Sequence, residues 1–224
     1  MFSSATFAFL DELAANNDRA WFAANRDRYE DLVRDPALDF ICAMQAPLTG
    51  IAPNFRADPR RMGGSLIRVF RDTRFSRDKT PYKTNIGIQF RHSLGKDVHA
   101  PGFYLHVASD GCFLGAGCWR PEAAALGRIR DWIVAKPERW FAVRDQPEFR
   151  AAWALAGDSL ARPPRAYAAD HPAIEDLKRK DFIALAPLSR GEIVGGDLVA
   201  LASGHFAAAV PLMAFLCAAA DVPY

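Results

Sequence analysis

A short stretch of the chain, RVFRDTRFSRDKTPYKT (68–84), gathers side chains that could bind an anion. It carries six cationic and two acidic side chains, whereas the whole chain has a formal net charge of only +2. Arginine presents a planar charged fork that fits phosphate or carboxylate, and lysine presents a mobile point charge. We therefore predict an anion-binding loop formed by Arg68, Arg71, Arg74, Asp78, Lys79 and Lys83.

The acidic residues Asp72 and Asp78 leave a second interpretation of this loop open. They could orient the arginines toward a ligand, or they could pair with them and pin the loop in place without any ligand. A run of charges is also often only a solvated surface. A closed network of ion pairs would need similar numbers of cations and acids, whereas this loop has six cations and two acids. We therefore favour the anion site.

Hydroxyl, imidazole and carboxylate groups in or near the loop could add chemistry to it. Tyr82 and Asp72 lie in the loop itself, and Tyr104 and His106 lie in the later segment GFYLHVAS (102–109). Such groups can donate, accept or transfer protons. The candidate catalytic residues are therefore Asp72, Tyr82, Tyr104 and His106, and their pattern specifies neither a reaction nor a cofactor.

The histidines and cysteines indicate no metal site. His92, His99 and His106 lack the spacing of a known metal site, and the cysteines are scattered. Cys112 and Cys118 fall in one predicted strand, about 20 Å apart and beyond disulfide reach. We expect all the thiols to be free, including Cys42 and Cys217 in apolar helical patterns, as in a cytoplasmic protein.

The apolar segment from Leu198 to Ala220 is nominally long enough to span a bilayer. It is rich in alanine, is interrupted by Gly204 and Pro211, and has no flanking lysine or arginine. We predict a buried helix, kinked near Pro211, and no membrane partner.

Secondary structure that would position these groups follows from the hydrophobic pattern. Apolar residues at helical spacing predict helices over about residues 7–14, 18–33 and 36–44. Asp18 is a predicted N-cap, and Asp35-Pro36 predicts the start of the third helix. A loop rich in Pro, Asn and Gly then follows over 53–64.

The sequence of the middle of the chain predicts strands. Residues 65–71 are dense in apolar side chains, and residues 85–92, 102–109 and 111–119 follow, the first two of them alternating apolar and polar. The turn Ser109-Asp110-Gly111 predicts a hairpin, and short turns imply antiparallel pairing. We expect helices to cover one surface of the sheet, and the other surface to carry Gln89, Arg91, Tyr104, His106 and Trp119.

Helices are predicted again over about 121–136, 138–144 and 147–156, followed by a loop-rich stretch and the C-terminal helices. The order helices, sheet, helices predicts an α+β fold, with a central antiparallel sheet flanked by N-terminal and C-terminal helices. Because no linker interrupts the pattern, we expect one domain over residues 1–224.

The stretch RVFRDTRFSRDKTPYKT resembles the signature of a bacterial and fungal family known as domain of unknown function 2461. The segments FLDELAANNDRAWFAANRDRYE, PGFYLHV, GAGCW and DHPAIEDLKRKDF resemble other parts of it. The resemblance implies no activity. It implies that the following residues belong to the family's defining pattern: Arg68, Arg71, Asp72, Arg74, Phe75, Asp78, Lys79 and Tyr82.

Three functions remain open at this point. The favoured one is an enzyme or binding protein for a phosphate- or carboxylate-bearing small molecule. The second is a module that binds nucleic-acid phosphates, which the near-neutral charge disfavours. The third is a non-catalytic protein whose basic loop is a structural salt-bridge clasp. The sequence leaves the oligomeric state open as well.

Overall fold

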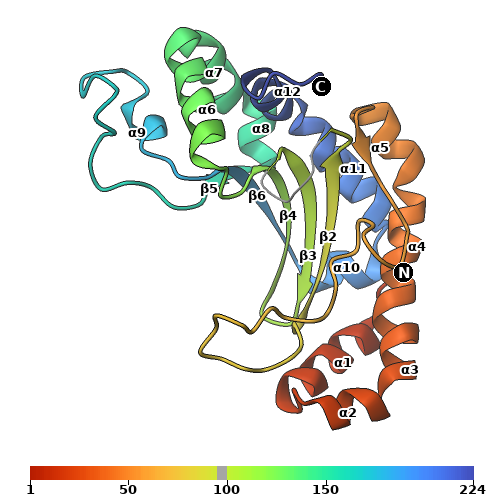
Figure 1. Cartoon of the computed structure of the whole chain (residues 1–224). Helices are drawn as coiled ribbons and strands as arrows, with labels where there is room; N and C mark the ends of the chain where they lie inside the picture. The colour runs from red at the N-terminus through yellow and green to blue at the C-terminus, as the bar shows by residue number, and fades with distance from the viewer. Residues whose placement is uncertain (95–99) are drawn as a thin grey trace.

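An antiparallel sheet forms the centre of the computed structural model, which describes residues 1–94 and 100–224 (Figure 1). Within these residues the sheet has six strands in the order β1-β2-β3-β4-β6-β5, and every neighbouring pair is antiparallel. The strands are β1 Phe55–Arg56, β2 Asn85–His92, β3 Gly102–Ala108, β4 Gly111–Cys118, β5 Ala154–Ala156 and β6 Phe182–Leu188. The predicted hairpin joins β3 to β4, and the predicted antiparallel sheet is confirmed.

Helices at both ends of the chain flank the sheet, which confirms the α+β class (Figure 1). The N-terminal ones are α1 Ser4–Ala15, α2 Arg19–Ala24, α3 Arg26–Tyr29, the π-helical turn η1 Glu30–Arg34, α4 Asp35–Ala43 and α5 Gln45–Ile51. Asp18 caps α2 as expected, because its carboxylate accepts hydrogen bonds from the backbone N–H groups of Ala20 and Trp21.

The pair Asp35-Pro36 does not begin a separate helix. Instead α3, η1 and α4 follow one another without a break, and the backbone N–H of Asp35 donates to Glu30 O, five residues back. Proline has no N–H and its ring crowds the carbonyl four residues earlier. The wider π turn lets the helical path continue past Pro36, and it places Arg34 at the turn.

The remaining helices come after strand β4 in the sequence. They are α6 Ala123–Ala135, α7 Pro137–Arg144, α8 Pro147–Ala152, α9 Ile174–Leu177, α10 Arg190–Gly195, α11 Leu198–Ala208 and α12 Val210–Ala219. The pair α11 and α12 is bent by 54°, next to Pro211 as predicted. Among the described residues no single helix is long and apolar enough to cross a membrane. The bent pair α11 and α12 together has the length and apolar composition of a membrane span, but this rests on length and composition alone.

The two faces of the sheet differ in their cover. Ile88, Leu105 and Leu114 pair across β2, β3 and β4, and all are fully buried. Helices α4, α10, α11 and α12 contact these strands, and they lie on one side of the sheet in Figure 1. The loop before β2 and the long segment between β5 and β6 project on the opposite side. We call that second side the open face.

The strand predicted over residues 65–71 needs correction. Residues 65–71 form no continuous strand, because Leu66 makes a single bridge to Ile88 and Phe70 a single bridge to Tyr82. Residues 65–71 lie beside β2 at Leu66 and then diverge from it. Phe70 therefore pairs with Tyr82, which precedes β2, and not with β2 itself.

Strand β6 was not predicted, and β5 occupies the end of the helix predicted over 147–156. In β6 every second residue from Phe182 to Leu188 is buried, which is a strand pattern. Two of these buried positions are alanines, and Pro187 interrupts the donors, so the local composition disfavours a strand. Pairing with both β4 and β5 overrides that local preference.

Candidate functional site

The basic loop stands on a short pair of extended segments. The backbone N–H of Arg71 donates to Pro81 O at 2.9 Å, and the N–H of Lys83 donates to Val69 O at 2.7 Å. Residues 72–80 project beyond these bonds. The two ends of the loop are therefore held together by backbone pairing before any side chain contributes.

Tyr82 lies in the core beneath the loop. Its ring stacks on Phe22 with the ring centroids 4.0 Å apart, and only 6% of the residue is exposed. Its backbone N–H donates to Asn17 Oδ1, and its carbonyl accepts from Asn17 Nδ2, both at 3.0 Å. The structure thus places this candidate catalytic residue as an aromatic anchor of the loop.

The acidic residues of the loop pair with its arginines. Asp78 contacts Arg71, and it also accepts hydrogen bonds from the N–H and hydroxyl of Thr80. Arg74 donates to both carboxylate oxygens of Asp72, at 2.7 and 3.0 Å. The Arg74 side chain lowers the pKa of Asp72 to about 2, and the Thr80 N–H, followed by Arg71, lowers the pKa of Asp78 to about 2.

Lys79 also turns inward, because its Nζ donates to Thr73 O at 2.8 Å. Arg77 is exposed, and it forms no ion pair with any residue that the structure describes. Arg71, Arg74 and Lys79 thus have partners inside the loop, and these contacts fix the shape of its tip.

The other two loop cations, Arg68 and Lys83, line a hollow of about 520 Å³ at the edge of the sheet. Its described lining contains no acidic residue. We call this hollow the cation pocket. The cations among its described lining residues are Arg34, Arg61, Arg68, Lys83 and Arg91.

Two of these cations pair with acidic residues that lie outside the pocket lining. Arg34 pairs with Glu30 at 2.6 Å, and Arg61 lies 3.4 Å from Glu30 and 3.6 Å from Asp35. Within residues 1–94 and 100–224, the remaining three form no ion pair: Arg68, Lys83 and Arg91.

The surroundings of Lys83 and Arg91 are costly for a charge. Lys83 is half-buried, its Nζ donates to Arg68 O at 3.0 Å, and burial, with the nearby Arg68 charge, lowers its pKa. The Nε of Arg91 is buried and has no hydrogen-bond partner among the described residues. An anion beside Lys83 and the unpartnered Nε of Arg91 would compensate the charge and supply an acceptor.

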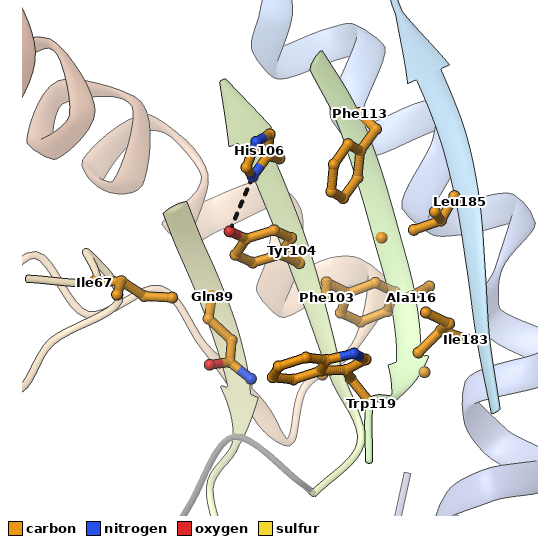
Figure 2. Close-up of a pocket in the computed structure, with 13 residues that line it drawn as sticks. Ile67, Gln89, Phe103, Tyr104, His106, Phe113, Ala116, Trp119, Ile183 and Leu185 are labelled. Atoms are coloured by element: carbon orange, nitrogen blue, oxygen red, sulfur yellow. Dashed lines mark hydrogen bonds between the residues drawn. The ribbon is translucent and has the colours of Figure 1, made fainter. Parts of the chain in front are cut away.

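A second hollow, of about 450 Å³, lies on the open face, and we call it the open-face pocket (Figure 2). One row of paired residues crosses it from β2 to β6. Tyr104 and His106 point into it from β3, and the Tyr104 hydroxyl lies 3.3 Å from His106 Nδ1. The paired residues that cross the pocket from β2 to β6 are Gln89, Tyr104, Gly115 and Leu185.

Burial tunes the two titratable groups of this pocket in opposite directions. It raises the pKa of Tyr104 to about 12. It lowers the pKa of His106, and the Asp110 charge acts in the opposite direction without cancelling it. Near pH 7 the Tyr104 hydroxyl therefore keeps its proton and His106 is neutral, and the two groups share a hydrogen bond at Nδ1. The imidazole also stacks on Phe113, with the ring centroids 4.6 Å apart.

The predicted site residues are thus divided between separate places. Tyr104 and His106 share the open-face pocket, whereas Asp72 lines neither pocket. Of the expected open-face residues, Gln89 and Trp119 line the same pocket, and Arg91 lines the cation pocket.

Arg34 and Arg61 were missed as site residues, because Arg34 is a single arginine among helical residues and Arg61 lies in a loop outside the basic stretch. The only hint in the sequence is the run Arg60-Arg61-Met62-Gly63-Gly64 (RRMGG), in which a pair of cations precedes two glycines. Nothing local connects this run to Arg68 or Lys83.

The described residues contain no group of histidine, cysteine and acidic side chains that could hold a metal ion. His92 is buried, and its Nε2 lies 2.7 Å from Pro223 O, while His99 lies outside the described residues. All four cysteines are free.

Comparison with known protein families gives a match over most of the chain. A family model described as "Conserved hypothetical protein (DUF2461)" matches residues 5–215. No curated protein and no solved structure matches the chain.

Proposed function

We propose that this chain, which belongs to the DUF2461 family of conserved hypothetical proteins, binds the anionic group of a small molecule in the cation pocket. One observation carries the proposal. Arg68, Lys83 and Arg91 line one hollow, and none of them forms an ion pair with a described residue.

Without an anion, the charges that line the cation pocket are poorly compensated. Arg68 is exposed, but Lys83 and Arg91 are half-buried, and the lowered pKa of Lys83 is a sign that its charge is unfavourable in this hollow. A phosphate or carboxylate oxygen would supply the missing acceptors and compensate the charge. A binding function therefore explains why the cost is tolerated.

The loop tip has a supporting role in this proposal. Pairing of Arg71 with Asp78 and of Arg74 with Asp72 holds residues 72–80, whose base carries Arg68 and Lys83. Lys79 adds a further internal bond. These residues position the cations of the pocket and do not touch the anion, and the proposal includes no reaction.

The test is calorimetric titration of the full chain with inorganic phosphate and pyrophosphate. Replacing Lys83 by methionine removes a charge and keeps most of the volume. We expect affinity to fall by roughly tenfold or more, as for the loss of one charge-assisted hydrogen bond. Without ligand, the melting temperature of Lys83→Met should stay close to that of the parent, because relief of the like charge beside Arg68 offsets the lost hydrogen bond from Nζ to Arg68 O.

Arg77→Ala is the matched control, because Arg77 is an exposed loop cation that does not line the pocket. Its affinity should match the parent's. At a phosphate concentration 100 times Kd, the parent should gain about 2.7 kcal/mol, or roughly 5–10 °C in melting temperature. Equal losses in both variants would indicate a general charge effect and contradict the proposal.

The internal pairs of the loop favour a second candidate, the structural clasp. In that case neither anion raises the melting temperature of the parent, and Asp78→Ala disturbs the loop as much as any change in the cation pocket. The two candidates differ in the response of the parent to phosphate, which only the binding function requires.

A further inference from the structure

We propose that the open-face pocket binds a flat aromatic ring of the same ligand, so that the ligand is an aromatic phosphate or carboxylate. This inference rests on the proposed binding of an anion in the cation pocket. Two observations carry it: the two pockets meet along one strand, and a glycine leaves the floor of the open-face pocket without a side chain.

The pockets meet at β2 and at the segment beside it. Ile67 lines both of them, and its backbone N–H donates to Gly87 O on β2 at 2.9 Å. Along β2, Gln89 and Arg91 lie on the same face, and they line the open-face pocket and the cation pocket respectively. Two residues of strand span about 7 Å. A ring joined directly to an anionic group can bridge that distance.

The walls of the open-face pocket suit a ring. Phe113, Leu185 and Ile183 come from β4 and β6, and Ile67 closes the side near the cation pocket (Figure 2). Trp119 stands at one end with 48% of its surface exposed. Aromatic and aliphatic walls with a few polar groups are typical of small-molecule sites, and aromatic rings stack favourably on such walls.

Gly115 forms the floor, and the backbone does not require a glycine there. A Cβ at this position would lie 3.4 Å from Tyr104 Cβ and 3.7 Å from Leu185 Cδ2, which are ordinary contacts. Gly117 differs, because its φ of +126° and a Cβ position 2.1 Å from Phe182 O exclude any side chain. Glycine weakens a strand and often marks the close approach of a ligand. We assign that reason to Gly115.

Charge selects the occupant of this face. A neutral ring alone would leave the adjoining cations Arg68, Lys83 and Arg91 uncompensated, whereas an anionic substituent on the ring places its charge beside them. The Tyr104 hydroxyl and His106 add a donor and an acceptor at the far end of the pocket for a polar substituent of the ring.

The experiment is calorimetric titration of the full chain with 1-naphthyl phosphate, 1-naphthoate, inorganic phosphate, acetate and 1-naphthol. We expect at least one aromatic anion to bind about tenfold or more tightly than its matched simple anion, because the ring buries apolar surface. The phosphate and carboxylate pairs show which anion the site prefers. Naphthol, which lacks the charge, should bind more weakly than the preferred aromatic anion.

Gly115→Val places a branched side chain on the floor of the pocket. It should abolish the aromatic advantage while the affinity for the simple anion is retained. Gly115→Ala, whose Cβ makes only ordinary contacts, is the second variant in case valine prevents folding, and it should reduce the advantage. Lys83→Met should weaken the aromatic and the simple anion by a similar factor.

The possible results separate this inference from the proposed function. If the simple anion binds but there is no aromatic advantage, or both Gly115 variants keep it, the inference is overturned and the proposed function stands. If naphthol binds as well as the aromatic anions while the simple anion still binds, the inference is overturned and the proposed function stands. If nothing binds, both fail. If the parent self-associates in sedimentation and Gly115→Val abolishes that association, a second copy covers the face and the inference is wrong.

Discussion

The environment of each titratable side chain, and not its identity, decides what it can do in this protein. Tyr82 and Tyr104 have the same phenol, but Tyr82 stacks on Phe22 beneath the loop, whereas the Tyr104 hydroxyl faces His106 in a pocket. Lys79 and Lys83 belong to one charged stretch, yet Lys79 binds a carbonyl of the loop tip and Lys83 lines the cation pocket. Residues of the same charged stretch therefore have different roles, according to what each side chain contacts.

At this scale we expect His106 to make stability depend on pH. Its pKa in the folded state is lowered, so the unfolded chain takes up the proton first as the pH falls below 6.5. The stability due to neutral His106 is present above that value and is lost as the pH falls toward the lowered pKa. The measurement is the urea-unfolding free energy between pH 7.5 and 5.5.

The comparison variant is His106→Gln, which keeps a polar side chain that does not titrate in this range. The free energy should fall less steeply in this variant than in the parent over the same interval. Identical slopes would mean that His106 titrates alike in the folded and unfolded chains.

At the scale of elements, strand β4 shows how backbone conformation limits substitution. Gly115 and Gly117 lie two residues apart on the same face, yet only Gly117 has a left-handed φ and a position closed by the carbonyl of Phe182. Residue Arg120, just after the strand, also has a positive φ of 47°, and its N–H donates to Asp181 Oδ1 at 2.7 Å. The end of β4 is thus tightly constrained, while its middle is not.

We expect the two glycines to respond oppositely to alanine. Gly117→Ala should cost about 2–3 kcal/mol or more, because strain at positive φ adds to a clash with Phe182 O. Gly115→Ala should leave stability unchanged or raise it by about 0.5–1 kcal/mol, since alanine loses less entropy in a strand. Denaturant unfolding of both variants checks this, and similar losses in both would contradict the distinction.

At the scale of the whole molecule, the C-terminal helices hold the sheet from one side only. Phe206 of α11 is fully buried and contacts Phe103 and Phe90 of the sheet, with ring centroids 4.7 and 6.0 Å apart. Buried apolar residues form one cluster that reaches from Phe2 to Ala219. Because this cover lies on one face, the opposite face is available for the pocket of Figure 2.

We expect Phe206→Ala to destabilise the molecule by about 3–5 kcal/mol, the usual cost of truncating a buried phenylalanine. Phe75→Ala is the matched control, because Phe75 is 95% exposed on the basic loop and should change stability by less than about 0.5 kcal/mol. Chemical denaturation measures both. A small loss for Phe206→Ala would mean that α11 contributes little to holding the sheet.

Features that depend on neighbouring residues could be predicted from the sequence. Alternation over 85–92 and 102–109, with a tight turn before Gly111, was enough to predict antiparallel strands, because side chains of a strand alternate between faces. The cap at Asp18, the bend near Pro211 and the α+β class were likewise predictable from local chemistry.

Which charges share a site depends on packing between distant segments, and the sequence did not reveal it. Arg34, Arg61 and Arg91 lie in a π turn, a loop and a strand, and no sequence spacing relates them to Arg68 and Lys83. Strand β6 exists because β4 and β5 pair with it on both sides, against its alanine-rich composition. Local patterns report local preferences, whereas a pocket depends on segments that packing brings together from distant parts of the chain.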